Sequence, residues 1–72
     1  MAKCPIANSI RKLRFEAGEM TQQALAEEIG VTRQTVMAIE SGKYSPSLEV
    51  AFKIALVFGA PLDEVFQYQP AD

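Results

Sequence analysis

The stretch TQQALAEEIGVTRQTVMAIE, from Thr21 to Glu40, decides the fold because it holds two short helical patterns with almost no chain between them. Its apolar residues recur at spacings of three and four, which gives each pattern one apolar face: Leu25, Ala26 and Ile29 in the first, Val36 and Ile39 in the second. Thr21 and Thr32 can each cap the start of a helix, and Gly30 can end the first helix in the left-handed conformation. A connection as short as Gly30-Val31-Thr32 predicts a sharp angle between the two helices.

Three further helical patterns flank this pair. One stripe of a first helix, which ends at Gly18, consists of Ile6, Ile10, Leu13 and Ala17. Ser47 can cap a fourth helix that runs to about Phe58. Pro61 stands in the first turn of a short fifth element, PLDEVF, where the missing N–H of proline costs nothing.

These patterns define the expected fold class. β signals are nearly absent, so we expect an all-α domain of five short helices, the second and third of which form a helix-turn-helix at residues 21–40. No linker, repeat or low-complexity segment interrupts the chain. We therefore expect one domain over residues 1–72, with its core between about 6 and 66.

Composition excludes several classes of function. Among the 72 residues there is one cysteine, Cys4, and no histidine, so neither a disulfide nor a metal site is expected. We expect no cofactor and no enzymatic activity, because no glycine-rich phosphate loop or carboxylate pair is present, and a redox role for Cys4 is a minor alternative. The lack of an 18-residue apolar run and of a signal-peptide pattern predicts a cytoplasmic protein without a membrane partner.

The segment MTQQALAEEIGVTRQTVMAIESGKYSPSLEVAFKIALVFGAPLDEVF, with the preceding IRKLRFEAG, resembles the DNA-binding domain of Xre-type regulators. These are the phage repressor and Cro-like helix-turn-helix proteins of bacteria. The resemblance rests on the combination of TQ, LA, G-V-[ST]-x-x-x-[IV], IE-x-G, and P-S-L followed by G-x-x-L-D-E. It implies a compact five-helix, lambda-repressor-like domain that regulates transcription, most simply as a repressor, by binding double-stranded operator DNA as a homodimer. No domain for a small-molecule effector is evident.

Three positions depart from the pattern of this family. EAGEMTQ holds one more residue between Gly18 and the TQ pair than the commonest spacing, which lengthens the loop after the first helix. Ala24 replaces an acidic cap partner, and Leu56 stands where lysine or arginine is usual. None of these positions lies on the expected recognition face, so they bear on the oligomer and on local stability more than on DNA binding.

The resemblance also implies a structural ion pair. In the family, an arginine at the end of the first helix pairs with the glutamate of the IE-x-G motif, and Arg14 and Glu40 match these positions. A desolvated pair of this kind fixes geometry more than it adds stability. The alternative is that Arg14 contacts a DNA phosphate.

The third helix, residues 33–40, is expected to enter the major groove with its N-terminal part. Its outward residues are the expected base contacts: Arg33, Gln34, Thr35, Met37 and Ala38. Arg33 can bond O6 and N7 of guanine, Gln34 can donate to and accept from adenine, and Met37 or Thr35 can contact a thymine methyl. Contacts with the DNA backbone are expected from Gln22, Thr32, Ser41, Lys43 and Tyr44. The alternative interpretation of this polar run is a solvated helix start.

A net charge of −2 and a pI near 5.0 are unusual for a protein that binds DNA. The charges are segregated, however, since residues 1–15 carry four cations and no acid, whereas residues 16–28 carry four acids and no cation. Because salt screens charges beyond about 10 Å, the local distribution matters more than the sum. Few cations are expected to meet phosphate, which predicts modest affinity with a shallow salt dependence.

The fourth helix, LEVAFKIALVF, is apolar nearly all round. A domain this small can hardly bury such a helix alone, so we expect a homodimer with an interface at Leu56, Val57, Phe66 and Tyr68. The tail from Phe66 to Gln69 alternates with period two and could add a small strand across the two-fold axis. Such a dimer predicts a palindromic operator. The alternative is an unusually apolar core helix.

A second class of function is compatible with the same fold. An antitoxin that masks a toxin, or an antirepressor that captures a regulator, would bind a protein instead of DNA. The acidic pI and the apolar fourth helix favour this alternative. A pure protein-binding module would select no sequence from a pool of random duplexes, which separates the two functions.

Overall fold

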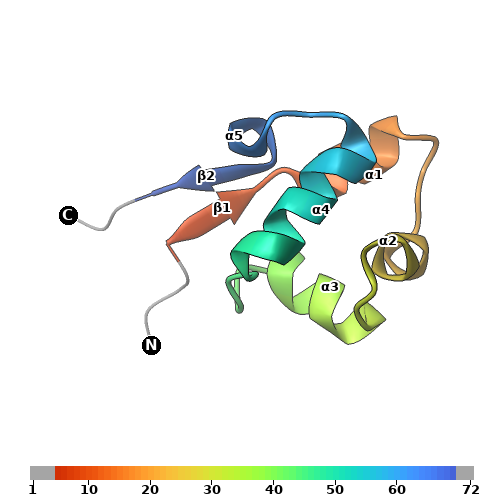
Figure 1. Cartoon of the computed structure of the whole chain (residues 1–72), viewed down its shortest axis with the longest axis horizontal. Helices are drawn as coiled ribbons and strands as arrows, with labels where there is room; N and C mark the ends of the chain where they lie inside the picture. The colour runs from red at the N-terminus through yellow and green to blue at the C-terminus, as the bar shows by residue number, and fades with distance from the viewer. Residues whose placement is uncertain (1–4, 70–72) are drawn as a thin grey trace.

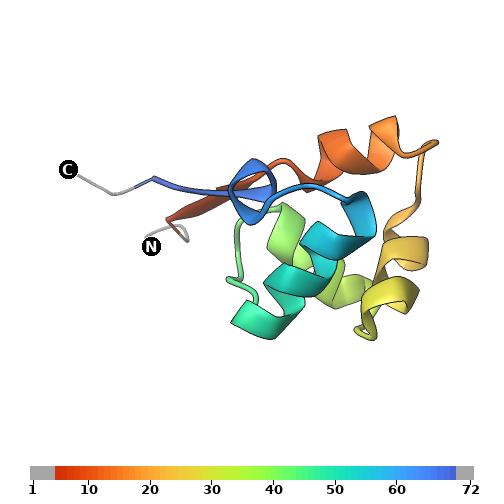
Figure 2. The same ribbon diagram turned by 45° about the horizontal axis from the view of Figure 1, so that its top comes forward.

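The computed structural model describes residues 5–69 of the chain as five helices and a two-stranded sheet (Figure 1). In chain order the elements are β1 (Ile6–Asn8), α1 (Ile10–Glu16), α2 (Gln22–Ile29), α3 (Arg33–Glu40), α4 (Leu48–Phe58), α5 (Leu62–Val65) and β2 (Phe66–Tyr68). The helices gather on one side, and the sheet projects from them toward both ends of the chain (Figure 2). The prediction of five short helices is confirmed.

The angle between α2 and α3 arises from the residues that begin and end these helices. Thr21 Oγ1 accepts the N–H of Ala24 at 3.0 Å, and Thr32 Oγ1 accepts the N–H of Thr35 at 3.1 Å. Gly30 ends α2 in the left-handed conformation with φ of 74°, which a residue with a side chain adopts only at a cost. The predicted caps, the glycine stop and the limits of both helices are confirmed.

The last two helices also begin near the predicted residues. Ser47 Oγ accepts the N–H of Val50 at 3.2 Å and so caps α4, which ends at Phe58. Pro61 is the N-cap of α5, one residue before the first turn in which it was expected. In that position proline fixes the extended backbone from which the short helix starts.

The sheet corrects the all-α prediction. Ile6 lies in β1 and not in α1, and β1 pairs antiparallel with β2 in the register Ile6↔Tyr68, Ala7↔Gln67 and Asn8↔Phe66. The tail thus forms the predicted strand, but it pairs within the same chain instead of across a two-fold axis. α1 starts only at Ile10, with Ser9 as its N-cap, because the chain turns there: Asn8 Oδ1 accepts the N–H of Ile10 at 3.1 Å.

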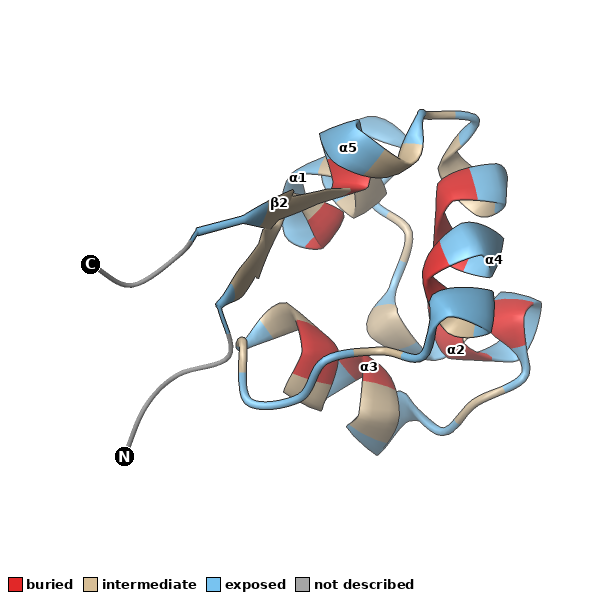
Figure 3. Cartoon of the chain, turned by 60° about the vertical axis from the view of Figure 1, so that its left-hand side comes forward, coloured by how far each residue is buried: buried red, intermediate tan, exposed pale blue. Residues whose placement is uncertain are grey.

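The core lies between the inner sides of the helices (Figure 3). Its largest fully buried side chains are Ile10, Leu25, Ile29, Val36, Ile39, Ile54 and Val65. α2 packs against both α3 and α4, and α5 packs against α4 and β2. The inward orientation predicted for Val36 and Ile39 is confirmed, and it fixes which side of α3 is left for solvent.

The loop between α1 and α2 carries the additional residue noted in the sequence. Gly18 and Glu19 both have positive φ, 82° and 61°, so two consecutive residues are left-handed. Arg14 holds the end of this loop, since its Nη1 donates to the carbonyl of Met20 at 2.7 Å and its own carbonyl accepts the N–H of Met20 at 2.9 Å. The longer loop thereby returns the chain to the start of α2.

Candidate functional site

The outward side of α3 is an open surface with polar side chains in its first turn and apolar side chains in the next. Arg33 and Gln34 are exposed at its first turn, and within residues 5–69 their side chains form no hydrogen bond or ion pair. Met37 is exposed and Ala38 is half-buried in the next turn. A shallow concavity of about 320 Å³ follows this side, lined by Gln34, Met37, Ala38, Ser41 and Lys43. Side chains that are both exposed and unpaired are free to contact a ligand.

Thr32 and Thr35 are already engaged with each other. Their hydroxyl oxygens are 3.0 Å apart, in addition to the cap that Thr32 forms with the N–H of Thr35. Thr35 is half-buried, whereas Thr32 is exposed. The two hydroxyls therefore stabilise the start of α3, directly beside the free side chains of Arg33 and Gln34.

The loop after α3 contains the remaining residues predicted to contact the DNA backbone. Ser41 Oγ donates to the carbonyl of Ala38 at 3.1 Å and extends the end of the helix. Lys43 and Tyr44 are exposed just beyond it, and Lys43 has no ion-pair partner within the described chain. Ser41, Lys43 and Tyr44 therefore follow the C-terminal end of α3. Gln22, which is also predicted to contact the backbone, lies in another helix as the first residue of α2.

Arg14, Glu40 and Gln22 join the three helices α1, α2 and α3. Arg14 Nε donates to Glu40 Oε2 at 2.6 Å and Arg14 Nη2 to Glu40 Oε1 at 3.1 Å, which is a two-pronged ion pair. The side chains of Arg14 and Glu40 are only 15% and 10% exposed. Gln22 Nε2 donates to Glu40 Oε1 at 3.3 Å, so the amide expected at the DNA backbone is also bound to this pair.

Two residues with a bearing on this surface were not singled out from the sequence. Asn8 Nδ2 donates to the carbonyl of Ile39 at 2.9 Å, and so connects β1 with the last turn of α3. An asparagine just before an apolar helical pattern is a local signal for a cap, but nothing local indicates a contact 31 residues away. Arg11 is the second residue. It is exposed on α1 and lines a concavity with Gln22 and Glu40.

The residues predicted for a dimer interface fall into two groups. Leu56 and Tyr68 are exposed, whereas Val57 and Phe66 are half-buried and pack against the core. On α4 the exposed apolar residues follow one line at intervals of four: Leu48, Phe52 and Leu56, with exposed fractions of 67%, 50% and 80%. We call these three residues the α4 stripe. It is the outer side of α4, opposite the buried Ala51, Ile54 and Ala55.

Residues 5–69 offer neither a cluster of metal ligands nor a membrane-spanning helix. In the part of the chain from residue 5 to 69, no three acidic or cysteine side chains gather to hold a metal ion. None of the helices described there is long and apolar enough to cross a bilayer. Cys4, with its suggested redox role, lies outside the described residues.

Known proteins resemble this chain in both sequence and structure. A helix-turn-helix family model matches residues 10–65. An uncharacterised HTH-type transcriptional regulator of Methanocaldococcus jannaschii is 54% identical over 50 residues, which are 69% of this chain and 76% of that protein. The cryptic phage CTXphi transcriptional repressor RstR of Vibrio cholerae is 39% identical over 59 residues, which are 82% of this chain and 52% of that protein.

A solved structure agrees with these matches. It is that of a candidate DNA-binding protein of Bacteroides fragilis, with a TM-score of 0.75 and 26% identity to this chain. The similarity covers 86% of this chain and 98% of that one.

Proposed function

Because the chain belongs to the helix-turn-helix family of DNA-binding transcriptional regulators, we propose that it reads a defined DNA sequence with α3 in the major groove. The observation that carries this proposal is the contrast within α3. Val36 and Ile39 are buried and hold the helix in place, while Arg33 and Gln34 are exposed and unpaired at its N-terminal turn. Arg33 would bond O6 and N7 of a guanine, and Gln34 would bond an adenine.

The remaining contacts follow from the neighbours of Arg33 and Gln34. Thr35, Met37 and Ala38 would complete the surface that faces the bases. Thr32 and Gln22 would approach the backbone at one edge of the groove, and at the other edge the loop after α3 supplies Ser41, Lys43 and Tyr44. The Arg14–Glu40 pair would act through geometry, since its charges are directed at each other and it fixes the start of α2 against the end of α3.

Repression by a homodimer is the form of regulation that we propose. RstR, a relative with 39% identity, is a transcriptional repressor. The α4 stripe supports self-association, because three large apolar side chains in one line on a small domain gain free energy when a second copy covers them. Leu56 and Tyr68 would lie in this interface, with Val57 and Phe66 beneath them. A two-fold dimer would bind a palindromic operator with half-sites about 34–36 Å apart.

Selection of bound sequences from a pool of random duplexes tests the proposal. Wild-type protein is expected to enrich one palindromic sequence. Arg33→Ala and Gln34→Ala are each expected to relax the preference at one base pair per half-site by about 1–3 kcal/mol. Gln23→Ala is the matched control, because Gln23 is exposed on α2, where its Nε2 donates to Glu27 Oε2 at 3.0 Å. Uniform loss of affinity in either α3 variant would instead assign that residue to phosphate contact.

A protein-binding role is the second candidate function. The α4 stripe favours it because exposed apolar side chains suit an apolar protein surface, and the net charge of −2 favours it because negative charge repels a polyanion. If wild-type protein enriches no duplex in the selection, the DNA-binding proposal is wrong and this candidate takes its place.

A further inference from the structure

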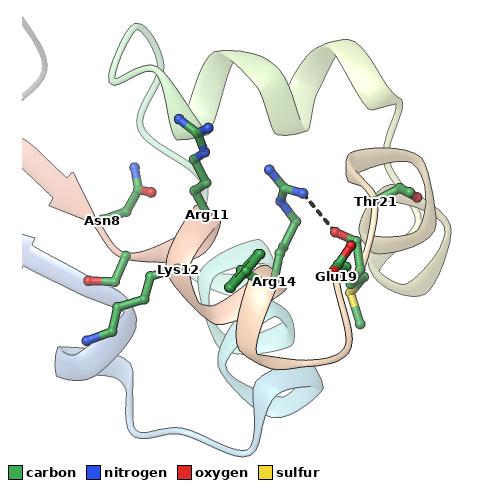
Figure 4. A pocket seen from close by; sticks show the side chains of 9 residues that line it. Asn8, Arg11, Lys12, Arg14, Glu19 and Thr21 are labelled. Atoms are coloured by element: carbon green, nitrogen blue, oxygen red, sulfur yellow. Dashed lines mark hydrogen bonds between the residues drawn. The ribbon is translucent and has the colours of Figure 1, made fainter.

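Two arginines lie three residues apart on α1 and therefore on one side of this helix. Figure 4 shows the side chains of Arg11 and Arg14 extending to that side, toward α3, while the side chain of the intervening Lys12 points away from them. The helix thus presents two guanidinium groups to the junction of α1, α2 and α3.

The charges of the two guanidinium groups are used differently. Arg14 is neutralised by Glu40 and also donates to the carbonyl of Met20. Arg11 is exposed, and its guanidinium has no hydrogen-bond or ion-pair partner among residues 5–69. Arg11 is therefore the cation with free charge on this side of α1.

Arg11 opens onto a concave surface at the start of α2. The concavity has a volume of about 450 Å³ and is lined by Arg11, Arg14, Thr21, Gln22 and Glu40. The carboxylate of Glu40 accepts hydrogen bonds from both Arg14 and Gln22, so its negative charge is already compensated. The guanidinium of Arg11 is the remaining uncompensated charge on this surface, which suits it to an anion.

The acidic residues of α2 lie near its C-terminal end, away from Gln22. Glu27 and Glu28 follow Gln22 by five and six residues, which is about 8–9 Å along a helix that rises 1.5 Å per residue. This separation is close to the screening length of about 8 Å at physiological salt. An anion beside Arg11 at the start of α2 would therefore be affected more by that guanidinium than by Glu27 and Glu28.

We propose that Arg11 binds a phosphate of the DNA backbone where the strand passes the junction of α1 and α2. This inference rests on the proposed DNA-binding function, and it adds a residue that positions the duplex without reading its sequence. Arg11 would anchor the same stretch of backbone that Gln22 approaches from α2. Such a contact at the edge of the reading surface would offset part of the repulsion between an acidic domain and a polyanion.

The test compares Arg11→Gln with Lys12→Gln, because both remove one positive charge from neighbouring exposed positions of α1. Binding to a duplex is measured by fluorescence anisotropy between 50 and 200 mM KCl, which is about the range over which phosphate contacts change affinity strongly. Arg11→Gln is expected to reduce the slope of log K against log salt by about 0.9, the value for one phosphate contact. Lys12→Gln is expected to keep the wild-type slope. Arg11→Lys is also expected to keep it, because it retains the positive charge.

The possible results separate this inference from the function on which it rests. Equal slopes for wild type and Arg11→Gln, or an equal reduction in Arg11→Gln and Lys12→Gln, would overturn the assignment of Arg11 while DNA binding stands. A change in base preference in Arg11→Gln would overturn it as well, because a phosphate contact carries no sequence information. If the wild-type protein binds no duplex at all, both proposals fail. Thermal unfolding of each variant is expected to match wild type, since neither Arg11 nor Lys12 has an ion-pair partner to lose among residues 5–69.

Discussion

Helices α3 and α4 have similar inner sides and very different outer sides. Inside, both contribute buried aliphatic residues to one core, with Ile39 from α3 and Ile54 from α4. Outside, α3 exposes Arg33 and Gln34 at its first turn, whereas α4 exposes the stripe of Leu48, Phe52 and Leu56. The inner sides of both helices form the core. The outer sides therefore point to two different partners.

Surface chemistry explains why one helix cannot serve both partners. Exposed polar groups already bond water, so they favour a ligand that offers specific hydrogen bonds in return, such as the edges of DNA bases. Exposed apolar groups gain free energy when any complementary apolar surface removes them from water. With the free polar side chains at the first turn of α3 and the apolar stripe on α4, the domain would be able to contact DNA and a second protein at the same time.

The largest expected effect is a loss of stability, and it tests whether the inner sides of α3 and α4 contribute equally to the core. Ile39→Ala and Ile54→Ala are each expected to lower the free energy of unfolding by about 3–4 kcal/mol, because each leaves a cavity in a fully buried site. Urea denaturation monitored by circular dichroism measures this loss. Met37→Ala and Lys53→Ala, at exposed positions of the same helices, are the controls and should each cost less than about 1 kcal/mol. A large loss in only one of the buried variants would mean that the core depends mainly on that helix.

The second prediction compares how much the ion pairs of α3 and α4 contribute to the free energy of unfolding. Glu40 of α3 and its partner Arg14 are 10% and 15% exposed, whereas Glu49 of α4 and its partner Lys53 are 78% and 47% exposed. Glu40→Ala is expected to cost about 2–3 kcal/mol, because it leaves a guanidinium with little solvent and no counter-charge. Glu49→Ala, the matched control, should cost less than about 0.5 kcal/mol. Thermal unfolding at low and high salt measures both, and equal losses would contradict a structural role for the Arg14–Glu40 pair.

The bounds of α2 and α3 could be predicted because they depend on residues close together in the sequence. Thr21, Gly30 and Thr32 act through hydrogen bonds and backbone angles within a few residues, so their roles could be derived from the sequence. Once Val36 and Ile39 are assigned to the core, the residues on the outward side of α3 can be predicted as well. Arg14 and Glu40 are 26 residues apart, and their pairing could be predicted only from the family resemblance.

The sheet and the outer side of α4 depend on contacts that the sequence does not specify locally. Ile6 continues the spacing of the α1 stripe, and only the pairing of β1 with β2 and the turn made by the Asn8 side chain decide against a helix there. Arg11 is one of several cations in the N-terminal part of the chain, and only the three-dimensional structure shows that it has no ion-pair partner in the described part of the chain. On α4, composition cannot tell which apolar residues face the core, because both sides are apolar.

A third prediction separates the two outer sides. Leu56→Gln is expected to weaken self-association by about tenfold, because it removes apolar area from the α4 stripe, and to leave the base preference unchanged. Met37→Gln is expected to change the base preference without affecting self-association. Analytical ultracentrifugation and selection from random duplexes measure the two properties. If Leu56→Gln self-associates like wild type, the dimer does not use this stripe.

The smallest expected effect concerns the caps that start α3 and α4. Thr32→Ala and Ser47→Ala each remove one side-chain acceptor from a helix N-terminus, and each is expected to cost about 1 kcal/mol of stability. Only the first change lies next to Arg33, so only Thr32→Ala should also weaken binding to the selected duplex beyond its loss of stability. Serine at position 32 keeps the hydroxyl and should restore both properties. Equal effects of Thr32→Ala and Ser47→Ala on DNA binding would mean that the first turn of α3 does not need its cap to present Arg33 to a base.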